Sequence, residues 1–245
     1  RLDILGWSVL AARGDEARDV IDSRFEQGEP FGVAFLNAHG SNLAASDPDF
    51  RKALSNMLLL NDGIGVDIAA RVLNGRGFPE NLNGTDFAPA YLAQTRHRHR
   101  VYLLGAKPGT AEKARDALSS LAPRHDYVGA RHGYFGASET AGVIEDIRRS
   151  GATTLLVALG NPAQELWIDR HLEATGVSVA FGVGALFDFL AGEVPRAPEF
   201  MRRAKLEWVY RLSLEPKRLF RRYVVGNPLF LARVARQRLL GRTPF

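Results

Sequence analysis

The 245-residue sequence contains no cysteine. Disulfide frameworks and metal sites with thiolate ligands are therefore excluded. It also lacks a run of about 20 apolar residues, the length that a membrane-spanning helix needs. The best candidate, residues 177–192, is interrupted by glycines and by Asp188, so we interpret it as a buried strand and turn. Any membrane contact is then expected to be peripheral. The sequence starts at Arg1 rather than at a methionine, which is compatible with further sequence before it.

Several familiar catalytic and cofactor motifs are missing as well. No GxGxxG or GxxxxGKS/T pattern indicates a dinucleotide site or a P-loop, and no GxSxG pattern indicates a nucleophilic hydrolase. The six histidines do not have the spacing of zinc ligands. The RHRHR stretch at residues 96–100 is interpreted as the exposed end of a helix.

Acidic residues are scarce in one part of the chain. Residues 196–245 hold 13 Lys and Arg against 3 Glu, which leaves 19 basic and 24 acidic side chains for residues 1–195. Eleven of the 13 cations are arginines, interspersed with Leu, Trp, Tyr, Val and Phe. Because arginine pairs with phosphate through two hydrogen bonds and the apolar residues suit a lipid or protein surface, this tail predicts an anionic, partly apolar partner.

Short apolar runs alternate with longer amphipathic ones, which is typical of parallel βαβ units. The fold class that we expect is α/β, with an open, mostly parallel Rossmann-like sheet, helices on both faces and a C-terminal helical appendage. We place the domain boundary so that residues 1–195 form the catalytic domain and residues 196–245 the basic appendage. Strands are expected at 2–9, 32–37, 57–61, 101–105, 153–160 and 177–182, and helices at 15–27, 47–56, 65–74, 85–95, 109–121, 139–150 and 162–175.

Polar and glycine residues follow several of these strands. Open α/β sheets bind ligands at the carboxyl ends of their strands, with phosphates at helix N-termini. Asp62, in the sequence Asn-Asp-Gly, is a candidate general base or metal ligand, or else a helix cap. The turn at 83–86, with Thr85 and Asp86, is either a plain capped turn or part of a site.

The stretch LGNPAQE at 159–165 begins another helix. Gln164 falls in its first turn, where it can bind a uracil edge or sugar hydroxyls, or simply belong to the helix start. The glycine turns at 105–109 and 182–184 leave a phosphate-binding role open. In the tail, Arg211, Arg218 and Arg222 can share one helical face if the helix tolerates Pro216 as a kink, with Arg221 one step away.

These pieces, in this order, resemble the WecG/TagA/CpsF glycosyltransferases (glycosyltransferase family 26), and among them the xanthan-type exopolysaccharide branch. The match runs over nearly the whole chain, and its specificity comes from several motifs in register. The stretches that carry it are NDGIGVDIAAR (61–71), NGTDF (83–87), VYLLGAKPGTAEKA (101–114), HGYF (132–135), LGNPAQELWI (159–168), FGVGALFDFLAGEVPRAP (181–198) and EWVYRLSLEPKRLFRR (207–222).

The resemblance implies a reaction. Such enzymes move a hexose-type sugar, with inversion, from a UDP donor to the 4-hydroxyl of a sugar carried on polyprenyl diphosphate, in bacterial surface or exopolysaccharide assembly. They act as peripheral proteins on the cytoplasmic face of the membrane, and no metal or other cofactor is expected. The family's base falls on Asp62. Its arginines for the acceptor diphosphate and membrane fall on Arg211, Arg218 and Arg221, with Arg222 beside them.

The donor pocket is expected to combine family positions with the strand-end turns. Its residues would be Asn37, Thr85, Asp86, Gly105, Lys107, Gly160, Gln164, Gly182, Gly184 and Asp188. Two positions depart from the teichoic-acid branch, which has threonine at the place of Phe35 and arginine at that of Asn81. We therefore expect UDP-glucose as donor, with UDP-N-acetylmannosamine or a UDP-linked uronic sugar as alternatives. Lys107 or a tail arginine would replace the missing cation.

Two other classes of function stay open at this point. A nucleic-acid-binding module would use the basic tail to grip phosphates, with affinity that falls steeply with salt. A nucleotide-sugar hydrolase or epimerase on the same scaffold would act without an acceptor. The acidic first 195 residues argue against nucleic acid.

Overall fold

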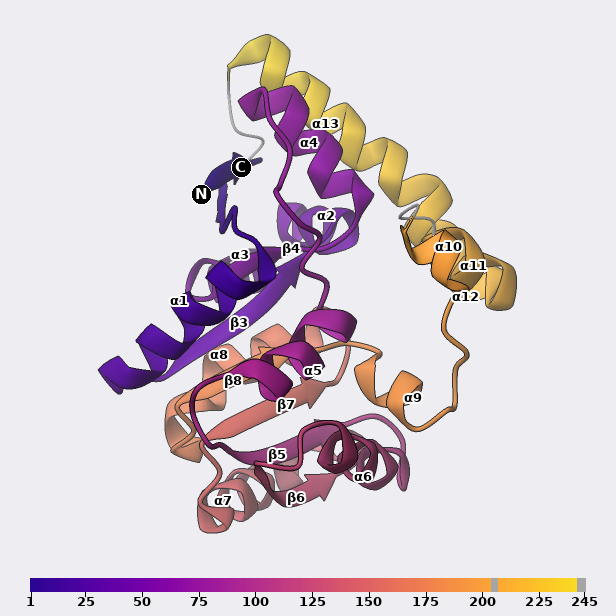
Figure 1. Cartoon of the computed structure of the whole chain (residues 1–245). Helices are drawn as coiled ribbons and strands as arrows, with labels where there is room; N and C mark the ends of the chain where they lie inside the picture. The colour runs from indigo at the N-terminus through magenta and orange to yellow at the C-terminus, as the bar shows by residue number, and fades with distance from the viewer. Residues whose placement is uncertain (204–206, 242–245) are drawn as a thin grey trace.

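The computed structural model describes residues 1–203 and 207–241, without the side chains of Arg202, Arg203 and Arg218. This part of the chain forms an α/β fold around one eight-stranded sheet (Figure 1). The strands are β1 (Leu2–Ile4), β2 (Trp7–Val9), β3 (Phe31–Leu36), β4 (Leu58–Asn61), β5 (Arg100–Gly105), β6 (Asp126–Arg131), β7 (Thr154–Ala158) and β8 (Val179–Gly182).

Helices connect the strands and form the C-terminal part. Those between strands are α1 (Gly14–Gln27), α2 (Ala38–Ser46), α3 (Pro48–Ser55), α4 (Ile64–Asn74), α5 (Gly84–Gln94), α6 (Thr110–Leu121), the 3-10 turn η1 (Ala137–Glu139), α7 (Thr140–Ser150) and α8 (Ala163–Thr175). After the last strand come α9 (Leu186–Leu190), α10 (Glu199–Arg203), α11 (Glu207–Leu214), α12 (Pro216–Phe220), the π-helical turn η2 (Arg221–Val225) and α13 (Gly226–Leu240).

The sheet order is β1-β2-β4-β3-β8-β7-β5-β6. All neighbouring strands run parallel except β1 and β2. The expected open, mostly parallel sheet with helices on both faces is confirmed. Because β3 and β8 lie side by side at its centre, the carboxyl ends of β4, β3, β8 and β7 form one continuous edge. Ligands of open α/β sheets bind at such an edge.

The structure differs from the prediction at three elements. The strand expected at 2–9 is a hairpin, because Leu5 and Gly6 adopt left-handed backbone angles (φ 53° and 87°) and reverse the chain. Strand β6 was missed because it is an edge strand whose residues are all half-buried, so no apolar alternation marks it. Helix α2 was also missed. It is capped by Asn37 and lies before the helix predicted at 47–56. That predicted helix is observed as α3, which Asp47 caps.

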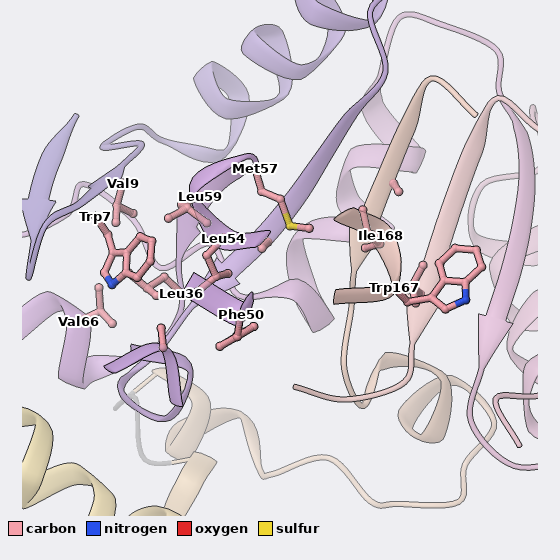
Figure 2. Packing of buried hydrophobic residues seen from close by; sticks show 14 of the residues in the cluster. Trp7, Val9, Leu36, Phe50, Leu54, Met57, Leu59, Val66, Trp167 and Ile168 are labelled. Carbon is pink, nitrogen blue, oxygen red and sulfur yellow. The ribbon is translucent and has the colours of Figure 1, made fainter. Parts of the chain in front are cut away.

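The core consists of two layers, one on each face of the sheet. Alternate residues of each strand point to opposite faces. In β3, Ala34 and Leu36 face one layer, whereas Val33 and Phe35 face the other. The first layer includes Phe50 and Leu54 of α3 and Trp167 and Ile168 of α8, and Figure 2 shows part of it. The second layer includes residues of α1, α5, α6 and α9.

The last helix belongs to the same core. Phe230 and Val234 of α13 are buried in the first layer, and α13 lies along α4 and α2 (Figure 1). Arg233 donates to Oδ1 of Asn42 over 2.8 Å, and Asn42 donates to the carbonyl of Gly226 over 2.7 Å. The boundary near residue 195 stays a prediction, but the chain after it folds back onto the sheet domain.

The prediction for the RHRHR stretch was right only in part: Arg96, Arg98 and Arg100 are exposed, but α5 ends at Gln94, before the stretch begins. His99 is fully buried and shares hydrogen bonds with Thr154 and Tyr91. The polypeptide turns into β5 at this point, and Asp22 accepts hydrogen bonds from Tyr91 and Thr95 beside it. Burial lowers the pKa of His99 to about 4. His99 and its partners Thr154 and Tyr91 therefore form a buried polar network at the start of β5.

Candidate active site

A cavity of about 970 Å³ lies at the carboxyl edge of the central strands. Its walls come from the ends of β3, β4, β7 and β8, and from residues at or beside the first turns of α2, α4, α5 and α8. Helix N-termini carry partial positive charge and unpaired N–H groups, which suit a phosphate or diphosphate. The cavity therefore has the position and charge that a nucleotide site on an α/β sheet needs.

Asp62 lies on the cavity wall directly after β4. It does not cap α4, because Gly63 occupies that position with a φ of 88°, and the Gly63 N–H donates to the Asn81 side chain over 2.7 Å. Oδ2 of Asp62 accepts a hydrogen bond of 3.0 Å from Asn37 Nδ2. Burial raises the pKa of Asp62, although Asn37 and the positive charges of Arg222 and Arg211 oppose the shift. A carboxyl group of this kind is suited to accept a proton.

Asn37 lies between β3 and α2 and is the N-cap of the helix. Its Oδ1 accepts the backbone N–H of Gly40 over 2.9 Å, which caps the helix, while its amide nitrogen holds Asp62. The capping bond fixes which end of the amide faces the carboxylate. Asn37 therefore orients Asp62 as well as starting α2.

The turn before α5 combines capping with a position on the cavity wall. Asn83 caps the helix by accepting the N–H of Asp86 over 3.0 Å and also accepts the Thr85 hydroxyl over 2.6 Å. Thr85 and Asp86 both line the cavity. Asp86 in turn accepts a hydrogen bond of 2.8 Å from Arg196, which also reaches Glu207 at 3.9 Å.

The first turn of α8 forms the opposite wall. Gln164 Oε1 accepts the backbone N–H of Gly184 over 3.0 Å. A Cβ atom at Gly182 would lie 2.9 Å from Gln164 Nε2, so glycine is needed there for the amide to pack against β8. Gly160 and Asp188 also line the cavity. The Gln164 side chain thus joins the first turn of α8 to the loop after β8.

The tail lies over this edge of the sheet. Arg211 of α11 and Arg222 of η2 line the cavity, together with Trp208, Tyr223 and Asn227. The Arg211 guanidinium lies over the Phe189 ring, 5.6 Å from its centroid. The Nε atoms of Arg211 and Arg222 are buried and have no hydrogen-bond partner in the described part of the chain. Burial, together with the charge of Arg222, lowers the pKa of His39 to about 4.

Two comparisons with known proteins show which family the chain belongs to. The model of the glycosyl transferase WecG/TagA/CpsF family matches residues 2–244. The chain is also similar to the N-acetylglucosaminyldiphosphoundecaprenol N-acetyl-beta-D-mannosaminyltransferase of Bacillus subtilis (strain 168), with 32% identity over 188 residues, which cover 76% of this chain and 72% of the relative. The chain belongs to the WecG/TagA/CpsF glycosyltransferase family. It is therefore a transferase, and the nucleic-acid-binding and hydrolase alternatives are set aside.

Most residues predicted for this glycosyltransferase site meet around one cavity. Those that line it are Asp62, Asn37, Thr85, Asp86, Gly160, Gln164, Gly182, Gly184, Asp188, Arg211 and Arg222. The cavity lining does not include Gly105, Lys107 or Arg221, and Lys107 and Arg221 are exposed to solvent. The side chain of Arg218 falls outside the described part of the chain.

Gly105 is where it is for a structural reason. Its φ is 139°, and a Cβ atom would come within 2.4 Å of the Ala158 carbonyl oxygen. The strand end can therefore pack against β7 only as glycine. Arg211, Arg218 and Arg222 of the tail, which were predicted to share one helical face, do not lie on one helix. Pro216 starts α12 as a separate helix, after Glu215 leaves the helical conformation (φ −130°, ψ 61°). A kinked continuous helix was the wrong prediction.

Sequence reasoning missed several residues that line the site of the glycosyltransferase. His39 follows the strand-end Asn37, Asn161 follows Gly160, and Tyr134 lies within the HGYF motif. Their neighbours carried the signal, because each stands next to a position that was considered. Glu207 and Trp208 of α11 open the EWVYRLSLEPKRLFRR motif, but no role in the cavity was assigned to them.

Neither a metal cluster nor a membrane-spanning helix is found in the described part of the chain. Within residues 1–203 and 207–241, no group of three or more His, Cys, Asp or Glu side chains could hold a metal ion. In the same ranges, no helix combines the length and the apolar character needed to cross a bilayer. Metal independence stays a prediction.

Proposed function

We propose that this glycosyltransferase transfers a hexose from a UDP-sugar to the 4-hydroxyl of a sugar carried on polyprenyl diphosphate, with inversion at the anomeric carbon. The printed name of the Bacillus relative supports a lipid-diphosphate-linked sugar as acceptor. The observation that carries the proposal is the position of Asp62. Its half-buried carboxyl group lies on the wall of the cavity that is also lined by two tail arginines, and burial raises its pKa.

The reaction can be written with the residues of this site. Asp62 takes the proton of the acceptor hydroxyl while that oxygen attacks the anomeric carbon from the face opposite UDP. The bond between the anomeric carbon and the diphosphate oxygen breaks, and UDP leaves with the electron pair. Helix N-termini on the cavity wall stabilise the charge on the leaving group. Since Lys107 does not line the cavity, a tail arginine is the better candidate for the cation that replaces the arginine missing at position 81.

The acceptor side is assigned to the tail. Forked guanidinium groups bind diphosphate well, and Arg211 and Arg222 present such groups to the cavity. Exposed apolar side chains on α12, η2 and the start of α13 support contact with a bilayer surface, where nearby cations each contribute about 1 kcal/mol toward anionic lipid. These side chains are Phe220, Val224, Val225 and Leu229. The protein would then act as a peripheral protein on the cytoplasmic face of the membrane.

For the donor sugar we keep glucose as the proposal, with N-acetylmannosamine as the second candidate. Phe35 and Asn81, which differ from the teichoic-acid branch, both line the cavity and support a neutral hexose. The relative's name supports N-acetylmannosamine. A panel of UDP-sugars tested against short-chain prenyl-diphosphate sugars, with products identified by mass spectrometry, decides between them. Absence of any transfer across the panel would refute the proposed reaction.

The role of Asp62 has its own test. Asp62→Asn should lower kcat by about 100- to 10,000-fold, the usual contribution of a general base, and should leave the Kd of UDP nearly unchanged. Asp116→Asn, at an exposed carboxylate of α6 that does not line the cavity, is the control and should retain full activity. Full activity in Asp62→Asn would exclude Asp62 as the base.

A further inference from the structure

One buried carboxyl group lies behind the cavity wall rather than on it. Glu165, in the first turn of α8, is 1% exposed. Its Oε1 accepts hydrogen bonds from two side-chain amides, Gln164 Nε2 at 2.8 Å and Asn161 Nδ2 at 2.5 Å. Both of these amides line the cavity, whereas Glu165 is not part of the lining. Glu165 therefore contacts the site only through its two neighbours.

The network determines what each amide can offer. Gln164 is engaged at both ends, because its Oε1 accepts the N–H of Gly184 while its Nε2 donates to Glu165. In the described part of the chain, Asn161 makes a side-chain hydrogen bond through its nitrogen and none through its oxygen. The bond to Glu165 fixes which end of the amide is the nitrogen, so the oxygen lies on the other side. That oxygen can accept a hydrogen bond from a ligand, while the nitrogen keeps one further N–H.

The orientation holds in either protonation state of Glu165. Its Oε1 accepts hydrogen bonds as a carboxylate oxygen or as the carbonyl oxygen of the neutral acid. The other oxygen, Oε2, is buried without a hydrogen-bond partner in the described part of the chain. Burial raises the pKa of Glu165 to about 7, but the polarity of Asn161 does not depend on that value.

We propose that Glu165 is a positioning residue for the nucleotide sugar, which makes Asn161 present a carbonyl oxygen to an imide N–H or a hydroxyl of the UDP-sugar. The inference rests on the proposed function, because it takes a UDP-sugar as the ligand. It adds a specificity element, since a ligand group that is itself an acceptor would meet the Asn161 oxygen without a proton between them. Such a mismatch leaves buried polar groups unpaired and lowers affinity.

The test compares two replacements of Glu165 in the full chain. Methionine has a similar length but no strong acceptor, whereas glutamine keeps an acceptor oxygen. Glu165→Met should raise the Kd of UDP at least about tenfold and lower the Tm, because the buried nitrogen of Gln164 loses its acceptor. Glu165→Gln should remain within about threefold of the unmodified protein. Glu173→Gln, at an exposed position on the same helix, is the matched control.

A double-mutant cycle separates positioning from a structural role. Asn161→Ala should weaken UDP binding by the same factor as Glu165→Met, and the double variant should be no weaker than either. Factors that multiply, or a Glu165→Met variant that binds UDP normally, would overturn the inference. If Glu165→Met does not fold, normal UDP affinity in Asn161→Ala overturns it alone.

Two further arms complete the experiment. The same cycle with CDP, which lacks the imide N–H, identifies the ligand group: coupling that disappears assigns the imide, and coupling that persists assigns a hydroxyl, each in support of the proposal. Failure of the unmodified protein to bind UDP would overturn the proposed donor and this inference together. Normal UDP binding with no effect of Glu165→Met would overturn this inference and leave the proposed function standing.

Discussion

Arg196 donates a hydrogen bond of 2.8 Å to Oδ1 of Asp86, and the two residues are 110 positions apart. The pair links the start of the tail to the first turn of α5. Arg196 also lies over the Phe189 ring, 5.1 Å from its centroid, on the side chain that Arg211 contacts as well. Arg196 therefore links the start of the tail to the part of the site that is expected to bind the donor.

Loss of this link should loosen the tail without unfolding the protein. The two side chains are 30% and 46% exposed, so Arg196→Met should cost about 0.5–1 kcal/mol of stability. Amide hydrogen exchange in α10 and α11 should accelerate severalfold, while exchange in β3 and β8 stays unchanged. Asp86→Asn should give the same pattern, and the double variant should not add to it. Unchanged exchange in α10 and α11 would contradict the assignment of Arg196 as the link.

The acidic limb of the activity profile should depend on Arg222. Burial raises the pKa of Asp62, and the charge of Arg222 opposes that rise. Since the base must be deprotonated, kcat/KM should fall as the pH drops through the pKa of Asp62. Arg222→Met removes an opposing cation, so the limb should move to higher pH. Arg222→Lys should restore its position, and Arg236→Met, an exposed cation of α13, should not move it. A limb that shifts to lower pH would contradict the prediction.

Stability should fall in mild acid, and His99 should account for part of the fall, as should His39, whose pKa burial also lowers. In the folded protein the pKa of His99 is lowered to about 4, chiefly by burial, against an ordinary value of 6.5. Below pH 6.5 the unfolded chain binds a proton that the folded chain does not, so the free energy of unfolding falls as the pH drops from about 6.5 to about 4. One such group gives a slope of up to about 1.4 kcal/mol per pH unit.

Urea unfolding at several pH values between 7.5 and 4.5 measures that slope. His99→Gln should be less stable at neutral pH, since it disturbs the hydrogen bonds to Thr154 and Tyr91, but its stability should depend less on pH. His132→Gln, which lies outside this buried network, should keep the slope of the unmodified protein. An equal slope in His99→Gln would remove His99 as one of its sources.

The last helix should be required for folding of the sheet domain. Phe230 is fully buried in the core layer that contains Phe50 and Leu36. Phe230→Ala should lower the free energy of unfolding by about 3–5 kcal/mol, because a large core side chain is lost and a cavity remains. Leu239→Ala, at a position 82% exposed on the same helix, should change it by less than about 0.5 kcal/mol. Both values follow from denaturant titrations monitored by circular dichroism.

Local patterns were enough for most of the parallel sheet and for one end of the site. Apolar runs that end in Asn, Asp or Gly located β3, β4, β7 and β8, and their common direction brought Asn37, Asp62 and Gln164 to one edge. The predictions failed where a local pattern was ambiguous. Strand β6 has no alternation, and the Leu5–Gly6 reversal depends on left-handed backbone angles that no residue type at position 5 announces.

For the tail, too, some properties could be predicted from the sequence and others depend on the tertiary structure. The eleven arginines of the tail and the charge inversion after residue 195 are properties of the sequence, and they predicted an anionic, partly apolar partner. Which arginines reach the cavity is decided by contacts over long sequence distances. Arg211 and Arg222 line it because Phe230 and Val234 anchor α13 to the first core layer and Arg196 is bound to Asp86, whereas Arg221 points to solvent.

The sequence alone thus determined the fold class, the edge of the sheet where the candidate site lies and the candidate base, because each depends on local periodicity and on the direction of parallel strands. Only the tertiary structure decided that Asn37 holds Asp62, that Asn161 and Gln164 both donate to Glu165 behind the wall, and that Gly105 packs against β7 outside the cavity lining. Side-chain orientation depends on which neighbours a burial site brings within hydrogen-bonding distance, and spacing along the chain does not contain that information.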